Sequence, residues 1–325
     1  MTRPAYEPSH CIICSHSVST LVADHEEIKR QVEELWAFHE RRIKPGAPVE
    51  HLRDRLAFSQ HPPFRLVQCD ECGLVYRNPA ERSHEVETAY TEDQPSRPKL
   101  EALHRSQRHS YGDQAKRLSE LLPRGATVIE VGSYVGAFLA EARERGMNAS
   151  GVDINACINQ FTRSLGFAVR DGELGDIDEA QVDAIAIWNT FDQLADPRAT
   201  LAAAAERLRP NGVLALRVPN GGYFARSIAE RSDPRPLALN NLLGFPYRWG
   251  FTPKSLVSLL GQLGFRIERT VGDVLVPTSD RWTRWWAQFE ERGLKAAQRR
   301  RVRRRPEDAP WFEIYATSSA SEMKR

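Results

Sequence analysis

The pattern of apolar and polar positions between residues 127 and 155 predicts a compact structural unit. Thr127–Val131 is a short run rich in β-branched residues, Ala137–Glu144 has helical periodicity, and Ala149–Ile154 is a second apolar run. A glycine-containing turn separates the first run from the helix. Two strands joined by a helix predict a parallel β-α-β unit with a right-handed crossover. The ligand of such a unit lies at the carboxyl end of the first strand.

The chain before this unit predicts short elements separated by breakers. Asp24 is an N-cap residue, and the apolar positions that follow it recur at helical spacing. A second short helix is predicted over Val49–Phe58, and Phe64–Val67 reads as a strand. The polar stretch Glu81–Pro98 is interpreted as a linker.

Helical patterning returns on both sides of the β-α-β unit. Lys99–Leu122 is predicted to be helical, with a break near Tyr111-Gly112. Towards the C-terminus, Thr252 is placed as the N-cap of a helix with proline at its first position. Phe265–Val271 follows as a strand.

Composition limits the class of protein. The chain has 325 residues, of which 41% are hydrophobic, and this is enough for a sizeable core. No apolar run approaches the roughly 20 residues of a membrane span. The first residues lack the apolar core of a signal peptide, so a cytoplasmic location is expected. The formal net charge of +2 names no partner by itself.

Four of the five cysteines form two C-x-x-C pairs. Cys11 and Cys14 make the first pair, and Cys69 and Cys72 make the second. Four thiolates are the tetrahedral ligand set of a structural zinc site. A redox pair or four unrelated thiols would be the alternative, and disulfides are not expected without a secretion signal. We therefore predict a zinc-binding module with a helical insertion over residues 1–80.

The turn between the first strand and its helix indicates which ligand the unit binds. Asp153 closes the second strand, where a carboxylate accepts hydrogen bonds from a ribose diol. The turn has the spacing G-x-x-x-G, with Tyr134 where the dinucleotide fingerprint has its middle glycine. Glu130 precedes the turn and would repel a pyrophosphate. These residues favour a cationic nucleoside without phosphate groups, such as S-adenosylmethionine.

The run from Glu130 to Asp153 resembles the class I S-adenosylmethionine-dependent methyltransferases. The family pattern is an acid, a glycine-rich turn and an acid that ends the second strand. The resemblance implies an α/β, Rossmann-like, doubly wound and mostly parallel seven-stranded sheet with an antiparallel last strand, here Phe312–Thr317. It also implies a core over residues 126–325, preceded by a linker and helices over 81–125.

The resemblance carries candidate roles onto individual residues. The implied donor-binding residues are Glu130, Gly132, Ser133, Tyr134, Gly136, Asp153, Ile154, Asp171, Gly172, Trp188 and Asn189. Many relatives have Glu-His after the fourth strand, where this chain has Asp192-Gln193. Asp192 is a candidate proton acceptor, although a capping role is equally open. In a predicted cap segment, residues 221–251, Tyr247 is a second catalytic candidate, with core packing as its alternative.

The cysteine module also has a narrower resemblance. Cys69–Pro79 looks like the zinc-knuckle leader that precedes some bacterial methyltransferase domains acting on small metabolites. This implies a small-molecule methyl acceptor. Two alternatives stay open: an RNA or protein methyltransferase that docks through the module and a basic arm, or a noncatalytic scaffold.

The basic arm is the segment Arg281–Arg305, within a predicted insert at residues 277–310. It holds ten basic and two acidic residues. Trp282, Trp285, Trp286 and Phe289 recur at helical spacing. Such a helix suits an anionic membrane surface or nucleic acid. The favoured interpretation is that the aromatic stripe packs on the protein's own body or on a second subunit, as in a homodimer.

Overall fold

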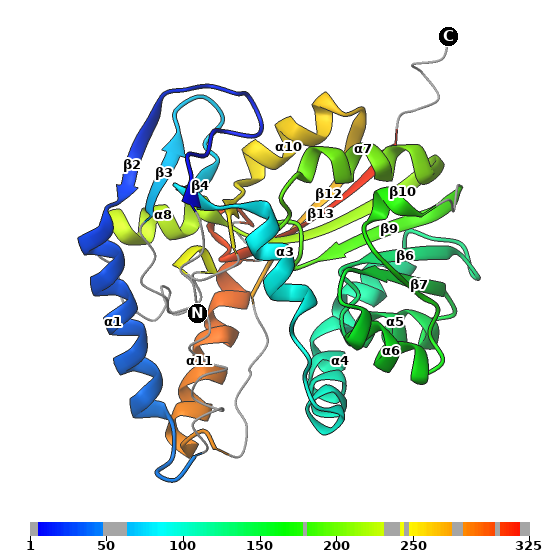
Figure 1. Ribbon diagram of the computed structural model, residues 1–325, viewed down its shortest axis with the longest axis horizontal. Coiled ribbons are helices and arrows are strands. Elements are labelled where there is room, and N and C mark those ends of the chain that lie inside the picture. The colour runs from blue at the N-terminus through cyan, green and yellow to red at the C-terminus, as the bar shows by residue number, and fades with distance from the viewer. Residues whose placement is uncertain are drawn as a thin grey trace. The chain divides into compact units, whose positions relative to one another are not determined.

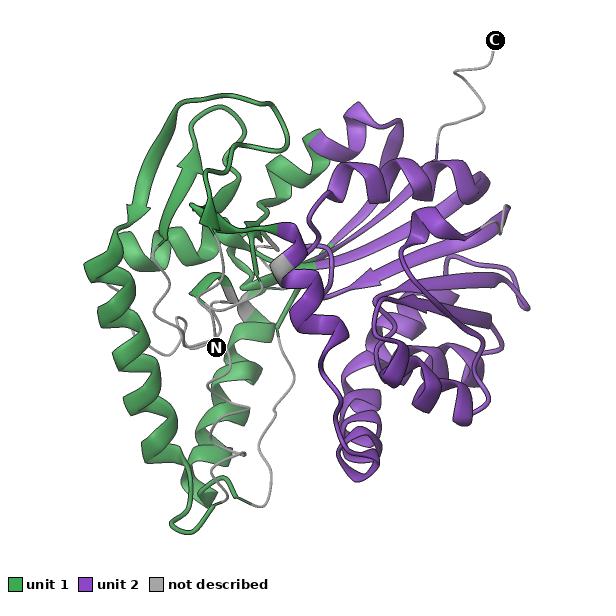
Figure 2. Cartoon of the chain, viewed as in Figure 1, with its two compact units in different colours: residues 1–82, 218–258, 271–312 green, residues 83–217, 259–270, 313–325 purple. Residues whose placement is uncertain are grey.

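The computed structural model describes residues 6–47, 64–177, 181–230, 241–243, 247–274, 282–302 and 306–318. The chain divides into two compact units (Figure 2). Unit 1 comprises Met1–Arg82, Val218–Ser258 and Val271–Phe312, and unit 2 comprises Ser83–Arg217, Leu259–Thr270 and Glu313–Arg325. The helix predicted over Val49–Phe58 lies outside the described residues. Within the described ranges, no helix has the length and apolar character needed to cross a membrane.

A mixed seven-stranded sheet carries the predicted β-α-β unit (Figure 1). Its order is β12-β13-β10-β9-β6-β7-β8. The four neighbouring pairs from β10 to β8 are parallel. This sheet confirms the predicted fold class. The strands are β6 (Thr127–Val131), β7 (Asn148–Asp153), β8 (Val169–Asp171), β9 (Val182–Trp188), β10 (Leu208–Pro219), β12 (Phe265–Asp273) and β13 (Trp311–Ser318).

The helices of this α/β core are α3 (Ser83–Thr91), α4 (Arg97–Ser119), α5 (Ala137–Glu144), α6 (Ala156–Ser164), α7 (Pro197–Arg207) and α10 (Pro253–Gln262), with a 3-10 turn η1 (Leu174–Asp176). α3 forms within the stretch that was interpreted as a linker. The predicted break at Tyr111-Gly112 is wrong, because α4 runs through it. Glycine inside a helix costs about 1 kcal/mol relative to alanine. Ion pairs from Arg108 on α4 to Glu141 and Glu144 on α5 help to offset that cost.

Unit 1 contains a second, four-stranded sheet in the order β11-β4-β3-β2. Its elements are β1 (Tyr6–Glu7), β2 (Ser19–Ala23), α1 (His25–Arg42), β3 (Arg65–Cys69), β4 (Val75–Asn78), β5 (Ala80–Glu81), α8 (Gly221–Ala229), η2 (Asn241–Leu243), β11 (Trp249–Gly250), α11 (Trp285–Val302) and η3 (Pro306–Asp308). β1 pairs with β5 outside that sheet. The predicted N-cap is confirmed, because the Asp24 side chain accepts a hydrogen bond from the Glu27 amide at 2.9 Å.

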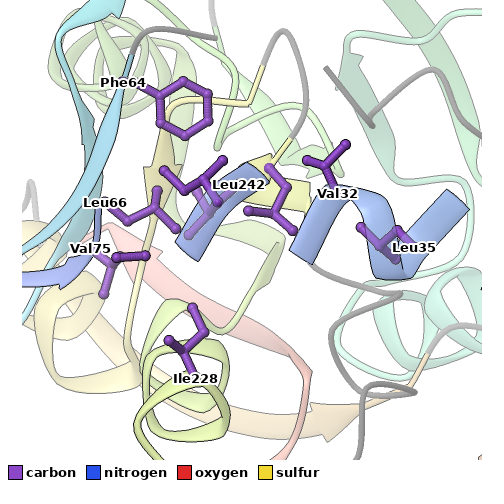
Figure 3. Close-up of a cluster of buried hydrophobic side chains, with 10 residues drawn as sticks. Val32, Leu35, Phe64, Leu66, Val75, Ile228 and Leu242 are labelled. Atoms are coloured by element: carbon purple, nitrogen blue, oxygen red, sulfur yellow. The ribbon is translucent and has the colours of Figure 1, made fainter. Parts of the chain in front are cut away.

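The core of unit 1 joins segments that are far apart in sequence. Figure 3 shows Val32 and Leu35 of α1 with Leu66 of β3. Ile228 of α8 and Leu242 of η2 belong to the same buried cluster. The segment predicted as a cap therefore contributes side chains to the core of the cysteine-containing module. Whether residues 1–80, 81–125 and 126–325 are separate domains stays a prediction.

The same segment also joins the sheet of the module. β11 pairs antiparallel with β4, with Trp249 opposite Tyr76. Next to this pairing, Arg77 donates to a carboxylate oxygen of Glu81 at 2.6 Å and to the backbone oxygen of Tyr247 at 2.9 Å. Both side chains of the ion pair are fully buried. A buried charge is tolerated only when it is paired and hydrogen-bonded, so this pair holds the chain at Tyr247 in place.

Helix α11 bears on the prediction for the basic arm. The Trp285 side chain is 72% exposed and the Phe289 side chain is 67% exposed within the chain, so these two rings do not pack on the protein's own body. Packing of the aromatic stripe on a second subunit stays a prediction. The helix instead buries Ala287, Lys295 and Val302. Small residues and a paired lysine therefore form its inner face.

Candidate functional site

The two C-x-x-C pairs come together in unit 1. The sulfur atoms of Cys11 and Cys72 lie 3.4 Å apart, and those of Cys14 and Cys69 lie 3.5 Å apart. All four sulfurs lie within 4.8 Å of one another. In a tetrahedral site with zinc–sulfur bonds of about 2.3 Å, sulfurs are roughly 3.8 Å apart. The cluster therefore fits a structural zinc ion, as the sequence predicted.

Backbone turns shape the second cysteine knuckle. The Cys69 amide donates to the Leu74 carbonyl at 2.9 Å, and the Gly73 amide donates to the Cys69 carbonyl at 2.9 Å. Gly73 has φ of +77°, a conformation that glycine adopts without strain. Four thiolates complete a zinc shell and leave no position for a substrate or a catalytic water. The cluster is thus suited to stabilising the module.

The glycine-rich turn of unit 2 follows β6 with unusual backbone angles. Gly132 has φ of +72°, and its amide donates to the Val152 carbonyl at 2.8 Å. A Cβ atom on Gly132 would lie 2.4 Å from the Thr190 hydroxyl oxygen, so only glycine fits there. Tyr134 also has positive φ, at 44°, and Gly136 begins α5 with φ of +68°. The turn leaves the backbone open to a close approach by a ligand.

Asp153 ends β7 directly beside this turn. Its carboxylate accepts hydrogen bonds from the backbone amides of Tyr134 and Asn155, each at 3.0 Å. Burial raises the pKa of Asp153, and the backbone hydrogen bonds partly oppose this effect. Each carboxylate oxygen keeps a second lone pair that a diol can use. Ile154 follows Asp153 in the chain, and its place in the donor-binding set stays a prediction.

Asp171 ends the next strand and is the cross-strand partner of Asp153. Its carboxylate accepts from the Asn159 amide at 2.7 Å and forms an ion pair with Arg163 at 2.8 Å. Burial alone would raise the pKa of Asp171, but hydrogen bonds from Asn159 and Arg163 lower it overall. Gly172 has φ of +115° and donates its amide to the Asp153 carbonyl at 3.1 Å. The two acids therefore lie side by side at one edge of the sheet.

Several buried polar atoms at this edge have no hydrogen-bond partner among the described residues. They are an oxygen of Glu130, the hydroxyl of Ser133, the indole nitrogen of Trp188 and both carboxylate oxygens of Asp192. Burial, and then the nearby Asp153, raise the pKa of Glu130 well above its usual value. Buried polar groups normally have partners, so such a concentration is typical of a ligand site.

Asn189 follows β9 and links two elements of unit 2. Its side chain donates to the Tyr111 hydroxyl at 3.3 Å and accepts from Arg217 at 2.5 Å. Burial, and then Glu130, raise the pKa of Tyr111 to about 12. On the same helix, a ring nitrogen of His104 lies 2.7 Å from the Val135 carbonyl. Helix α4 is therefore tied to the glycine-rich turn.

Asp192 is fully buried, and burial raises its pKa to about 7, against a hydrogen bond from its own backbone amide and the charge of Arg217. Gln193 beside it accepts a hydrogen bond from the Tyr90 hydroxyl. Burial, and then Asp192, raise the pKa of Tyr90. Sequence reasoning missed Tyr90, because it lies in the polar stretch that was interpreted as a linker. Val86 and Tyr90 are four positions apart, and this helical spacing was the pattern in the sequence that could have predicted α3.

The structure brings the predicted donor-binding residues together in unit 2, from Glu130 to Asn189, with Asp192 directly after them. Tyr247 belongs to unit 1, where its side chain is 9% exposed. The individual roles of these residues, including catalysis by Tyr247, stay predictions.

This fold and site define a class I S-adenosylmethionine-dependent methyltransferase. The sequence profile described as "Methyltransferase domain" matches residues 103–270, which is just over half of the chain. The chain belongs to this methyltransferase family, and S-adenosylmethionine is its cofactor. No curated protein sequence matches the chain.

Solved structures with a similar backbone fold are methyltransferases whose sequence identity to this chain is low. One is a chain of the complex between the Haloferax volcanii Trm112 methyltransferase activator and a methyltransferase. Its sequence is 16% identical to this one, the TM-score is 0.47, and the match covers 71% of this chain and 97% of that chain. A S-adenosylmethionine-dependent methyltransferase from Thermotoga maritima is 17% identical, with TM-score 0.46 and coverages of 68% and 95%. One from Archaeoglobus fulgidus is 17% identical, with TM-score 0.44 and coverages of 65% and 94%.

Proposed function

We propose that this methyltransferase acts on a small molecule whose accepting atom carries a proton, and that Asp192 removes this proton. The observation that carries the proposal is the state of Asp192. Its carboxyl group is fully buried, has no hydrogen-bond partner in another described residue, and has a pKa raised to about 7. A general base works best when its pKa lies near the working pH.

The burial of Asp192 also supports the choice of acceptor. Because the carboxyl group has no exposed surface, an acceptor must enter the interior of the protein to contact it. A small molecule enters more readily than a folded macromolecule. The resemblance of the cysteine module to leaders of small-metabolite methyltransferases supports the same class. An acceptor with an O–H or N–H group would supply the missing partner of the carboxylate.

The residues around the glycine-rich turn are proposed to hold the methyl donor. Asp153 would accept the ribose hydroxyls, and Asp171 and Gly172 would lie near the base. Glu130 would bind the ammonium group of the methionine moiety, which would also lower the pKa of that carboxyl group. When bound, S-adenosylmethionine supplies a methyl group activated by a positively charged sulfur.

The chain itself would contribute orientation and proton removal. Holding the acceptor in line with the methyl carbon converts a bimolecular step into an effectively unimolecular one. The acceptor atom forms a bond to the methyl carbon as the carbon–sulfur bond breaks, and the acceptor's proton passes to Asp192. Tyr90, which donates to Gln193, would position the residue next to this base.

Release of S-adenosylhomocysteine tests the proposal. Purified protein would be incubated with S-adenosylmethionine and a panel of small amines and alcohols, and in parallel with RNA and with protein. Turnover with a small acceptor, lost in Asp192→Asn with donor binding retained, is the expected result. Turnover with RNA or protein only would contradict the proposed acceptor class, and full activity of Asp192→Asn would contradict the proposed base.

A further inference from the structure

Helix α11 is fixed to unit 1 by its inner face and by one of its acids. Glu290 forms an ion pair with Arg42 of α1, whereas Glu291 pairs with Lys295 of the same helix at 2.7 Å. The Arg284 amide donates to the Arg42 carbonyl at 2.8 Å. α1 and α11 accordingly lie side by side within unit 1 (Figure 1). The acids of the helix are thus engaged inside the unit.

The outer face of α11 carries aromatic rings and arginines. We define it by its exposed aromatic and arginine side chains, Trp285, Trp286, Phe289, Arg292, Arg299 and Arg300, beside which Gly293, Ala296 and Ala297 are also exposed. The spacing of Trp285, Phe289, Arg292 and Arg299 places these four residues on one side of the helix, over about 21 Å. Among the described residues, no acid forms an ion pair with the three arginines of this face. The face carries three positive charges and no negative charge.

The ring arrangement leaves aromatic surface open to a ligand. The rings of Trp285 and Phe289 meet edge to face, with centroids 6.3 Å apart and an interplanar angle of 77°. The two side chains stay 72% and 67% exposed in this arrangement. Exposed aromatic faces in series with unneutralised guanidinium groups are the combination that binds single-stranded nucleic acid: bases stack on the rings and phosphates pair with the arginines.

We propose that the outer face of α11 binds a single-stranded polynucleotide. The charge of the face complements a phosphate backbone, and its rings accept bases of any sequence. The proposal concerns binding and does not depend on the methyl acceptor proposed above.

The same face is poorly suited to a membrane. A helix that lies on a bilayer presents apolar residues along its contact face and basic residues on the opposite or flanking side. Here Arg292 and Arg299 continue the line of Trp285 and Phe289. The opposite face, with Ala287 and Val302, is buried within the unit. Inserting the aromatic rings deeply would draw those arginines towards the acyl chains.

Fluorescence anisotropy with a labelled 20-nucleotide oligouridylate, measured over a series of salt concentrations, tests the proposal on the full-length protein. Trp285→Ala/Phe289→Ala should weaken binding at least about fivefold while leaving the salt dependence unchanged. Arg292→Gln/Arg299→Gln/Arg300→Gln should weaken binding and reduce the log–log salt slope by about 2. The matched control is Arg170→Gln/Arg266→Gln/Arg269→Gln, which removes the same charge from exposed positions outside α11 and should bind as the wild type does.

Three results would overturn the proposal. The first is the absence of oligonucleotide binding by the wild type at low salt. The second is equal weakening by the control triple variant, since this would indicate attraction to the net charge only. The third is evidence for a different partner. The wild type would float with phosphatidylserine vesicles or dimerise at higher concentration, the aromatic variant would lose this property, and its binding of the oligonucleotide would be unchanged. Circular dichroism of each variant verifies that α11 still forms.

Discussion

Asp192 links the chemistry proposed for the site to the stability of the fold. An aspartate in an unfolded chain has a pKa of roughly 3.9, and burial in the folded protein raises the pKa of Asp192 to about 7. Between these values the folded protein holds a proton that the unfolded chain has released. The stabilising contribution of the protonated group is complete below the lower pKa and is lost as pH rises through the higher one.

We therefore expect Asp192→Asn, which cannot titrate, to gain stability relative to the wild type as pH rises from 4 to 7. The expected gain is roughly 1.4 kcal/mol per pH unit, measured by urea unfolding at several pH values. For the proposed reaction, kcat/KM of the wild type should rise through pH 7 as the carboxylate forms. Parallel stability curves for the two proteins would show that the pKa of Asp192 is not raised.

Asp153 provides a second test on a single residue. Asp153→Ala removes hydrogen bonds from a charged acceptor, each worth roughly 1.5–3 kcal/mol, so affinity for S-adenosylmethionine should fall at least about tenfold. Isothermal titration calorimetry measures the change. Asp113→Ala, which removes an exposed carboxylate from α4, is the control and should bind normally. Unchanged affinity of the Asp153 variant would refute the proposed ribose contact.

Among the structural elements, the β4–β11 region of unit 1 depends on a buried ion pair. Burial lowers the pKa of Arg77 to about 10, so the guanidinium stays charged at neutral pH and needs the Glu81 carboxylate. The Arg77 side chain also lies over the Phe64 ring, 3.8 Å from its centroid. The pair thus fixes β4, β5 and the chain at Tyr247 together.

Glu81→Gln is expected to lower the free energy of unfolding by about 3–5 kcal/mol, because it leaves a buried charge without its counterion. The double variant Arg77→Met/Glu81→Leu removes both charges and should be less destabilised than the single variant. Thermal and urea unfolding of the three proteins measure this order. A double variant that is the least stable of the three would mean that packing of the arginine, rather than its charge, dominates.

At the scale of the whole molecule, the metal cluster and the donor residues lie in different compact units. The four cysteines are in unit 1, and the residues proposed to bind the donor are in unit 2. Sites that share no partner usually behave additively. Loss of metal should therefore act on the stability of unit 1 and leave donor binding largely intact.

Cys69→Ser tests this separation. Elemental analysis should give about one zinc per wild-type chain and little in the variant, together with a lower melting temperature. Calorimetry should still show binding of S-adenosylmethionine within about threefold of the wild-type affinity. Cys157→Ser, which changes the cysteine on α6, should keep both the metal and the affinity. Retention of zinc by Cys69→Ser, or loss of donor binding in parallel with the metal, would contradict the expectation.

The sequence by itself determined the elements whose signals are local. The period of the apolar residues and the glycines of the turn predicted β6, α5 and β7, and the first and second C-x-x-C pairs predicted the cysteine cluster. The β-α-β signals and each C-x-x-C pair are local, whereas the meeting of the two pairs, 55 and 61 positions apart, was inferred from the four ligands that zinc requires. The sequence also predicted that the acids at the strand ends lie at one edge of the sheet, because the carboxyl ends of parallel strands meet there.

Only the tertiary structure decided where distant segments meet. The pairing of β11 with β4 and the burial of Ile228 and Leu242 beside α1 depend on contacts across more than a hundred residues, which no local pattern encodes. α4 continues through Gly112, and its ion pairs with α5 join residues that no local pattern brings together. The aromatic residues of α11 face outward because Ala287, Lys295 and Val302 fill the space against unit 1, and helical spacing shows that a stripe exists without showing which side is covered.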